Sequence, residues 1–375
     1  MGIWCDFLIQ PGDDMSDRTY FIVDSHLDLA FCAIQVNRDL TQPAATVRVH
    51  DSVSTARSFG SCTTTFPELH KGRVGIVFGT VMSRIDTNDR WTRTGMWDQT
   101  QCYGVGIGHC AFYKAMERRG IIRQIYTVEN LDACVAAWAQ PSADTPIGLV
   151  LAMESADPIL DPDQVSEWRD LGLKMVSISH YGVSSYCHGT GTEGGLLDRG
   201  RPLLDALKAA GIIVDMTHTT DQAFWEILDY YDGPVAASHH NCRALTPGQR
   251  QLTDDMIRAI VERGGVIGAA FDAWMLDPEW KRGVPCYEQT TKATLETVVD
   301  HIDHVCQLAG NANHSGIGTD LDGGYGQEQS PRDLNTIADL QNLVPIFERR
   351  GYSEEDIQKV LSGNWVRLLK SVWGR

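Results

Sequence analysis

The sequence predicts a (β/α)8 barrel, the α/β fold in which parallel strands alternate with helices around a closed sheet. Two observations carry this prediction. Eight short apolar runs recur along the 375 residues, and segments with helical spacing separate them. In addition, seven of these eight runs end at a histidine, an aspartate or a glutamate. In such a barrel the carboxyl ends of the strands open onto one face, where active-site residues gather.

The predicted strands lack the alternation of polar and apolar residues that a one-sided sheet shows. Residues 74–82 read Val-Gly-Ile-Val-Phe-Gly-Thr-Val-Met, which fits a parallel strand that is buried on both faces. The eight runs span residues 20–27, 74–82, 147–153, 174–179, 212–217, 234–238, 266–271 and 315–319.

Helical segments, several of them ended by glycine, fill most connections between the runs. They span about residues 98–119, 163–171, 202–210, 221–230, 254–263, 290–309, 333–350 and 353–369. Residues 37–72 are polar and aperiodic, so we expect an insertion of helix and loop there. Neither a solenoid repeat nor a linker rich in Pro and Gly divides the chain. The sequence therefore predicts one barrel domain over residues 1–375, with additional helices at the C-terminus.

Composition and charge limit the classes of partner. The net charge of −17 argues against nucleic acid or an anionic membrane surface. The longest apolar stretch, residues 74–82, is too short to span a bilayer, and the first twenty residues carry four aspartates and no apolar core. The ten cysteines are scattered without a C-x-x-C pair, which is typical of reduced thiols. We therefore expect a cytoplasmic protein without a membrane partner.

The candidate site consists of the ligand-type residues at the strand ends. His26 and Asp28 lie two residues apart, so on an extended strand both side chains point to the same side. Of the later runs, one ends at Asp272, which is not assigned to the site, and five end at the candidate residues Glu154, His180, His218, His239 and Asp320. Imidazole with carboxylate suits zinc or a similar first-row divalent ion. Because one ion takes three or four protein ligands, this larger set indicates two ions bridged by Glu154.

Each of these residues alone has an ordinary structural explanation. A single histidine at a strand end is usually a hydrogen-bonded polar residue, Glu154 could cap the next helix, and Asp320 could belong to a turn. Their coincidence at the ends of separate strands favours the metal site. By contrast, His301 and His304 lie three residues apart inside a predicted helix, where we expect packing or solvent contact.

In order and spacing these residues resemble the membrane (renal-type) dipeptidases, peptidase family M19, a branch of the amidohydrolase-like metal hydrolases. The resemblance runs from about residue 20 to residue 370. The motifs that carry it are Asp24-Ser-His26-Leu-Asp28, Met153-Glu154, Ser177-Ile-Ser-His180, Asp215-Met-Thr-His218, Ser238-His239, Pro247-Gly-Gln-Arg250, Asp300-His-Ile-Asp-His304 and Gly316-Ile-Gly-Thr-Asp320-Leu-Asp-Gly323.

The resemblance implies a barrel with two zinc ions per chain at the carboxyl ends of the strands. His26 and Asp28 would bind one ion, and His218 and His239 would bind the other. Glu154 would bridge the two. The resemblance also implies a homodimer.

The resemblance further implies roles in catalysis. His180 would bind substrate and stabilise the developing oxyanion, Arg250 would pair with the C-terminal carboxylate of the substrate, and Asp320 would be the general acid and base. Where family members commonly have two glycines after the bridging glutamate, this chain has Ser155-Ala156, which adds bulk near the substrate.

The expected activity is hydrolysis of small dipeptides, including L-Xaa-D-Xaa, by a hydroxide held between the metals. Two alternatives stay open. The same site could act on an N-acyl amino acid or a lactone, since loops rather than the fold set specificity. The protein could also be a metal-binding protein without catalytic activity.

Overall fold

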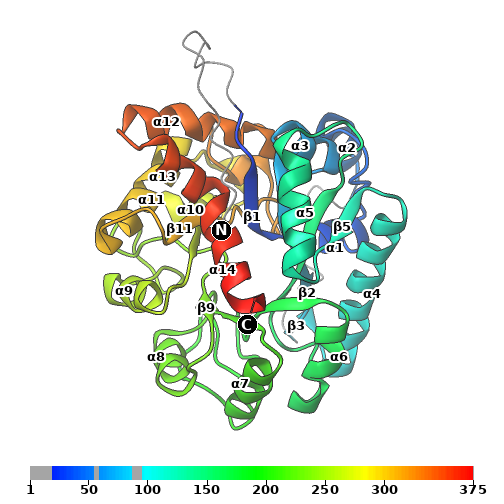
Figure 1. The fold of residues 1–375 in the computed structure, drawn as a ribbon, viewed down its shortest axis with the longest axis vertical. Coiled ribbons are helices and arrows are strands. Elements are labelled where there is room, and N and C mark those ends of the chain that lie inside the picture. Colours follow the sequence, from blue (N-terminus) through cyan, green and yellow to red (C-terminus); the bar gives the residue numbers. More distant parts are fainter. Residues whose placement is uncertain (1–18, 55–58, 87–94, 375) are drawn as a thin grey trace.

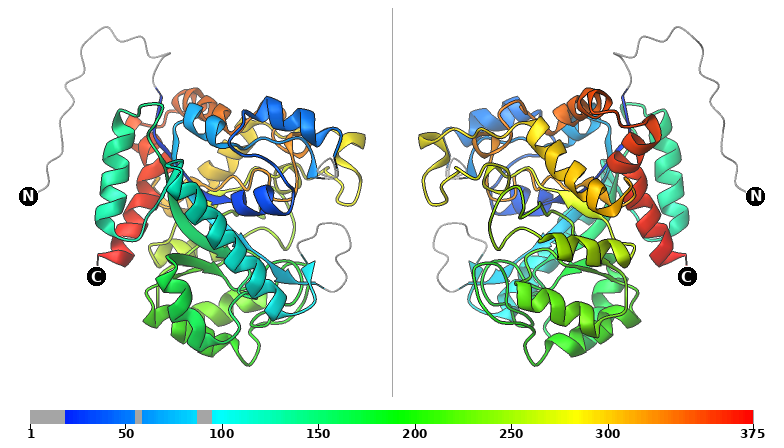
Figure 2. Two further views of the ribbon diagram at one scale, coloured as in Figure 1. Left: turned by 90° about the vertical axis from the view of Figure 1, so that its right-hand side faces the viewer. Right: turned by 90° about the vertical axis from the view of Figure 1, so that its left-hand side faces the viewer.

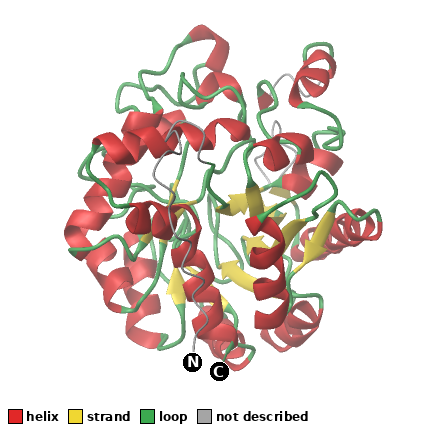
Figure 3. Cartoon of the chain, turned by 45° about the horizontal axis from the view of Figure 1, so that its top comes forward, coloured by secondary structure: helices red, strands yellow, loops and turns green. Residues whose placement is uncertain are grey.

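The computed structural model describes residues 19–54, 59–86 and 95–374. Over these residues the chain forms a barrel of parallel strands, with the strands at the centre and helices around them (Figure 1, Figure 3). Residues 1–18, which include most of the segment searched for a signal sequence, lie outside the described part of the chain. No helix within the described residues is long and apolar enough to cross a membrane.

All eight barrel strands were predicted from the apolar runs. They are β1 (Ile22–Leu27), β2 (Val74–Met82), β6 (Ile147–Glu154), β7 (Leu173–Ser177), β8 (Ile213–Asp215), β9 (Val235–Ala236), β10 (Ile267–Ala269) and β11 (Ser315–Ile317). Their order around the sheet is β10-β11-β1-β2-β6-β7-β8-β9, and every pair is parallel. The last four strands are shorter than predicted, with two or three residues each.

The barrel closes between β9 and β10. The backbone N–H of Ala237 donates to the carbonyl of Val266 (2.9 Å), and the N–H of Gly268 donates to the carbonyl of Ala237 (2.8 Å). With this contact the parallel sheet forms a ring, and the predicted fold class is confirmed.

Most predicted helices form, but the one expected at residues 333–350 begins as a 3-10 helix at Ile337–Asn342, and the one expected at residues 353–369 contains a π-helical turn at Lys359–Gly363 and continues to Trp373. The α-helices are α1 (Leu29–Ile34), α2 (Ala44–Asp51), α3 (Phe66–Lys71), α4 (Gln99–Arg118), α5 (Val128–Ala139), α6 (Val165–Asp170), α7 (Gly200–Ala209), α8 (Asp221–Tyr230), α9 (Asp254–Glu262), α10 (Ala273–Leu276), α11 (Leu295–Ala309), α12 (Leu343–Arg349), α13 (Glu354–Gln358) and α14 (Asn364–Trp373). The insertion at residues 37–72 contains α2 and α3.

One strand–helix unit was missed by the sequence analysis. The strand β5 (Ile122–Gln124) pairs with β6 outside the ring, and α5 follows it. Three residues around an exposed Arg123 are too short to give a strand pattern. The helix α5 lies beside the C-terminal helix α14 (Figure 2).

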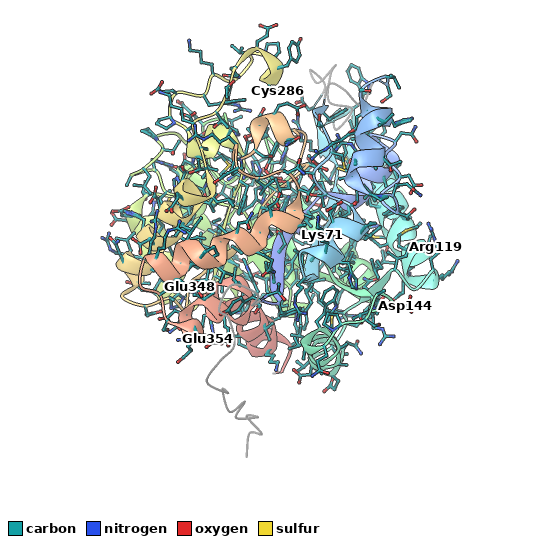
Figure 4. All side chains as sticks on the ribbon, turned by 90° about the horizontal axis from the view of Figure 1, so that it is seen from above. Lys71, Arg119, Asp144, Cys286, Glu348 and Glu354 are labelled. Atoms are coloured by element: carbon teal, nitrogen blue, oxygen red, sulfur yellow. The ribbon has the colours of Figure 1, made fainter. Side chains whose placement is uncertain are left out.

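The helix predicted to begin at residue 290 begins at Leu295 instead. The side chains of Thr294 and Thr297 form a capping box that fixes this start. Residues 277–293, which precede the cap, form an excursion with one short 3-10 turn at Cys286–Glu288. Figure 4 shows this excursion at the edge of the molecule, where Cys286 is labelled.

Trp365 of α14 joins the C-terminal helices to the barrel. Its side chain is fully buried, its ring centroid lies 5.3 Å from that of Phe78 in β2, and its indole N–H donates to the carbonyl of Ile317 in β11 (3.1 Å). A Cβ atom at Gly316 would lie 2.4 Å from the indole nitrogen, so only glycine leaves room for this contact.

We expect Trp365→Ala to lower the free energy of unfolding by about 3–5 kcal/mol, because the change leaves a large cavity against two barrel strands. Urea denaturation followed by circular dichroism measures this difference. The control is Trp225→Ala, since Trp225 is 40% exposed on α8 and its loss should cost less than about 1 kcal/mol. Equal losses in the two variants would contradict the proposed anchoring role of Trp365.

Candidate metal centre

The ligand-type residues from separate strand ends meet at Glu154, the last residue of β6. The Nε2 atoms of four histidines lie close to the same oxygen, Oε1 of Glu154. The distances are 3.6 Å for His26, 3.5 Å for His180, 3.2 Å for His218 and 3.4 Å for His239. Glu154 is 3% exposed, so this convergence takes place in the interior of the molecule.

Two aspartates complete the cluster. Oδ1 of Asp28 lies 4.0 Å from Nε2 of His26, and Oδ1 of Asp320 lies 3.7 Å from the same nitrogen. The hydroxyl of Thr80 in β2 donates to Oδ1 of Asp28 and so orients this carboxylate. The structure thus brings all seven predicted strand-end residues together.

Hydroxyl groups behind two of the imidazoles orient the rings. Ser238 donates its hydroxyl proton to Oδ2 of Asp215 (2.5 Å), so its oxygen accepts from Nδ1 of His239 (2.8 Å). Thr190 donates to the carbonyl of His218 (3.3 Å) and accepts from Nδ1 of the same residue (3.1 Å). Because Nδ1 carries the proton in both rings, Nε2 presents a lone pair toward Glu154.

Two buried aspartates hold the strand ends in place. Asp24 accepts from the backbone N–H of His26 (3.1 Å) and from the N–H of Thr319 (2.9 Å), which links β1 to the end of β11. Asp215 accepts from the N–H of Ser238 (2.9 Å), which links β8 to the end of β9. Both aspartates belong to the motifs that carry the family resemblance, but their structural role could not be predicted from the sequence.

Burial keeps three of the four imidazoles neutral. It lowers the pKa of His218 and His239 well below the usual range and that of His180 to about 3. Burial would raise the pKa of Glu154, but the imidazoles that face it outweigh burial and hold the pKa well below its usual value. An ionised carboxylate surrounded by neutral imidazoles is a set of donors that divalent metals bind.

The carboxylates of the cluster favour the binding of a positive charge. Burial opposes protonation of His26, but Glu154 and Asp28 outweigh burial and raise the pKa of His26 to about 10. Burial and the proximity of Glu154 raise the pKa of Asp28 to about 7 and that of Asp320 well above its usual range. The ionised Glu154 thus disfavours ionisation of Asp28 and Asp320, and a bound cation would stabilise the charged form of all three carboxylates.

The cluster offers the kinds of donor atom that divalent metals bind. Nε2 of His26 is buried and has no hydrogen-bond partner among the described residues, as expected of a ligand atom. Three groups have ligand atoms within 4.8 Å of one another. They are His26–Glu154–His239, Glu154–His180–His218 and His26–Asp28–Asp320. Glu154 belongs to two of these groups, which is the arrangement required of a bridging ligand.

The distances between ligand atoms do not reproduce the predicted division of the ligands between two ions. By these distances His218 is grouped with His180, and His239 with His26. The Nε2 atoms of His218 and His239 nevertheless lie only 3.3 Å apart. The division between ions therefore stays a prediction, and so does the assignment of His180 to substrate rather than to metal.

Five of the seven cluster residues, all except His26 and His239, line a cavity of about 380 Å³, which is large enough for a small ligand. Arg250, from the segment after β9, lies on the same cavity and is 2% exposed. Its Nη2 donates to the carbonyl of His239 (3.0 Å), while its Nη1 is buried without a hydrogen-bond partner among the described residues. A buried guanidinium with a free N–H edge at a cavity is suited to bind a carboxylate.

Other cavity-lining residues were not found by the sequence analysis. The guanidinium of Arg282 lies 4.3 Å from the ring centroid of Trp274 and 4.8 Å from that of Tyr181. Arg84 donates to Oδ2 of Asp86 (2.6 Å) and to the carbonyl of Tyr181 (3.1 Å). These residues lie in connections whose course no periodic pattern indicates.

Ser155 and Ala156 do not line the cavity. Ser155 adopts a left-handed backbone conformation with φ of 69°, in which glycine is favoured. Its hydroxyl donates to Oδ2 of Asp157 (3.0 Å), so the extra side chain is accommodated beside the pocket rather than inside it.

The two helical histidines lie outside the cluster, as predicted. Nδ1 of His301 accepts from the backbone N–H of Cys242 (3.0 Å), and Nε2 of His304 bonds Oδ1 of Asp254 (2.8 Å).

Known proteins that resemble this chain include dipeptidases. The model of the membrane dipeptidase family (peptidase family M19) matches residues 17–373. Dipeptidase tcpJ of Claviceps purpurea is 31% identical over 208 residues, which cover 54% of this chain and 45% of that protein. A Klebsiella pneumoniae protein from the pqqA 5' region, described as uncharacterized, is 33% identical over 182 residues, which cover 48% of this chain and 63% of that protein. The matched part of the chain thus spans between 45% and 63% of the length of these two curated relatives.

Solved structures show the same fold. A metallo peptidase from Rhodobacter sphaeroides, liganded with a phosphinate mimic of the dipeptide L-Ala-D-Ala, has a TM-score of 0.77 at 22% identity and covers 95% of this chain and 100% of its own. The probable dipeptidase PvdM of Pseudomonas aeruginosa has a TM-score of 0.74 at 19% identity and covers 95% and 96%. With a family model matched over nearly its whole length, this chain belongs to the membrane dipeptidase family, peptidase family M19.

Proposed function

We propose that the protein is a zinc-dependent dipeptidase that hydrolyses the peptide bond of small dipeptides. The observation that carries this proposal is the convergence of four imidazoles on Glu154, beside a cavity whose wall contains Arg250. Membership of the dipeptidase family supports it.

Five residues would hold two zinc ions. They are His26, Asp28, Glu154, His218 and His239, with Glu154 as the bridge. When bound, the ions would polarise the scissile carbonyl and lower the pKa of a water molecule. The hydroxyls of Ser238 and Thr190 fix the ring orientation that such binding requires.

Arg250 would bind the C-terminal carboxylate of the substrate. Its Nη1 has no hydrogen-bond partner among the described residues, so a substrate carboxylate would supply the missing acceptor. Because the guanidinium is held through Nη2 by the carbonyl of His239, its distance from the cluster is fixed. A fixed carboxylate site limits the length of peptide that can place its scissile bond at the centre.

Asp320 and His180 would act on the reacting atoms. Asp320 lies beside His26 on the cavity and would take the proton of the attacking water and deliver it to the leaving amine. His180 is neutral and can donate one ring N–H to the oxyanion that forms on the scissile carbonyl.

The stereochemistry of the second residue is part of the proposal. The Rhodobacter sphaeroides protein binds a mimic of L-Ala-D-Ala, so the substrate panel should contain both L- and D-residues at that position. We propose that L-Xaa-D-Xaa dipeptides are among the substrates.

We expect the purified protein to contain about two zinc ions per chain, because the donor set provides two ligand groups joined by one carboxylate. Glu154→Gln should lower the metal content to less than about half, since both groups lose their shared anionic ligand. Elemental analysis by mass spectrometry after dialysis measures this. Glu262→Gln, at the exposed end of α9, is the control and should keep the wild-type metal content. Full metal content in Glu154→Gln would exclude a bridging role.

We expect Asp320→Asn to keep its metal content but to lower kcat for dipeptides by about 10²–10⁴-fold, because the amide cannot transfer the proton. Metal analysis and turnover must be measured on the same preparation. A variant with wild-type turnover would show that another group transfers the proton, and a variant without metal would show that Asp320 is a ligand.

We expect Arg250→Met to raise KM for dipeptides by roughly 10–100-fold, the loss expected when a charge-assisted hydrogen bond is removed. The matched substrate is the dipeptide amide, which lacks the carboxylate and should respond little to the change. Arg258→Met, on the exposed surface of α9 where Arg258 pairs with Asp255, is the control protein. If the variant still preferred the free carboxylate as strongly as the wild type, Arg250 would not be its binding group.

A further inference from the structure

Asp272, at the carboxyl end of β10, is a buried carboxylate that the proposed mechanism does not use. It is 6% exposed and lines the same cavity as the metal cluster. Its Oδ1 accepts from the backbone N–H of Trp274 (3.2 Å) and from Nε2 of Gln329 (2.8 Å). Among the described residues none donates a hydrogen bond to Oδ2, so one oxygen of an oriented carboxylate is left without a partner.

The sheet register brings Asp272 and Asp320 to the same end of two neighbouring strands. Ala269 of β10 is paired with Ile317 of β11, and both aspartates lie three residues further along their strands. The backbone N–H of Phe271 donates to the carbonyl of Thr319 (2.9 Å), so the alignment continues to this point. Asp272 therefore lines the cavity near Asp320, the residue proposed to transfer the proton, and contributes to its raised pKa.

Asp272 needs a positive partner that the protein does not supply in contact. Burial raises its pKa to about 6, which still leaves the carboxylate mostly ionised at neutral pH. Arg282 and Arg250 act on it only at a distance, since neither forms an ion pair with it. Arg282 is instead held over the rings of Trp274 and Tyr181. Oδ2 of this carboxylate has no donor among the described residues, and a ligand in the cavity that Asp272 lines could supply one.

We propose that Oδ2 of Asp272 binds the α-ammonium group of the substrate. This inference rests on the proposed dipeptidase function and sharpens it, because it selects substrates with a free amino terminus. An N-acyl amino acid and a lactone have no ammonium group at this position, so both would leave Asp272 unpaired. With Arg250 as the site for the carboxylate, the cavity would recognise both charged ends of a dipeptide.

The test compares two ligands that differ only in the ammonium group, L-alanyl-alanine and propionyl-alanine, each with L- and D-alanine at the second position. KM is measured for the dipeptides and the competitive inhibition constant for the propionyl analogues. Asp272→Asn should raise KM for the dipeptide by about 10–100-fold, because a charge-assisted hydrogen bond is lost. The inhibition constant of the propionyl analogue should change by less than about threefold, since that ligand never made this bond.

Asparagine retains the ability to cap α10 through its side-chain oxygen, so the variant is expected to fold. Asp277→Asn is the matched control. Asp277 is also 6% exposed and also flanks α10, but its oxygens accept from the backbone N–H groups of Glu279 (3.0 Å) and Lys292 (2.7 Å) rather than facing the cavity. It should alter thermal stability without changing the preference for the free amine.

The outcomes separate the inference from the function on which it rests. Wild-type protein loaded with zinc that cleaves no dipeptide would overturn the proposed function. Wild-type protein that cleaves dipeptides, together with an Asp272→Asn variant that keeps the full preference for the ammonium group, would overturn only the inference. The inference would also be overturned if Asp272→Asn raised KM for L-alanyl-L-lysine but not for L-alanyl-L-norleucine, since Asp272 would then bind a side-chain ammonium.

Discussion

The approach of four imidazoles to one oxygen of Glu154 is the constraint on which the rest of the structure depends. Glu154 ends β6, and the histidines come from the ends of β1, β7, β8 and β9. Only a closed parallel barrel brings the ends of strands so distant in sequence to one point. Such a cluster of buried polar groups is unfavourable unless each group is paired, so the arrangement is acceptable because metal ions would satisfy it.

Two buried aspartates beneath the cluster fix neighbouring strand ends relative to each other, and so fix the positions of the side chains at those ends. Asp24 accepts hydrogen bonds from the backbone N–H groups of His26 and Thr319, so it fixes the end of β1 relative to the end of β11. Asp215 does the same for β8 and β9 and also orients the ring of His239 through Ser238. Ligand positions in this barrel are therefore set by hydrogen bonds between neighbouring strands as well as by the side chains of the ligands themselves.

The barrel and its cluster could be predicted because both leave local patterns in the sequence. Apolar runs predicted the eight strands, and residues at the ends of six of these runs gave the candidate ligands. The strand β5 is too short to leave a pattern. The roles of Asp24 and Asp215 could not be predicted either, because buried hydrogen bonds have no period along the chain. The cation–π contacts of Arg282 depend on the path of residues 277–293. This connection has no periodic sequence pattern, so its path could not be predicted from the sequence.

Backbone conformation adds a constraint that residue types alone do not reveal. Ser155, His218 and Asp320 have φ values of 69°, 68° and 60°, in the left-handed region that costs non-glycine residues roughly 1–3 kcal/mol each. All three lie in or next to the metal cluster, where the chain turns sharply as it leaves a strand. Glycine would relieve the strain at His218 and Asp320 but would remove the proposed metal ligand or the proposed acid. The barrel therefore tolerates strained backbone where the chemistry needs a side chain, and Ser155, whose hydroxyl is held by Asp157, shows that such a turn does not require glycine.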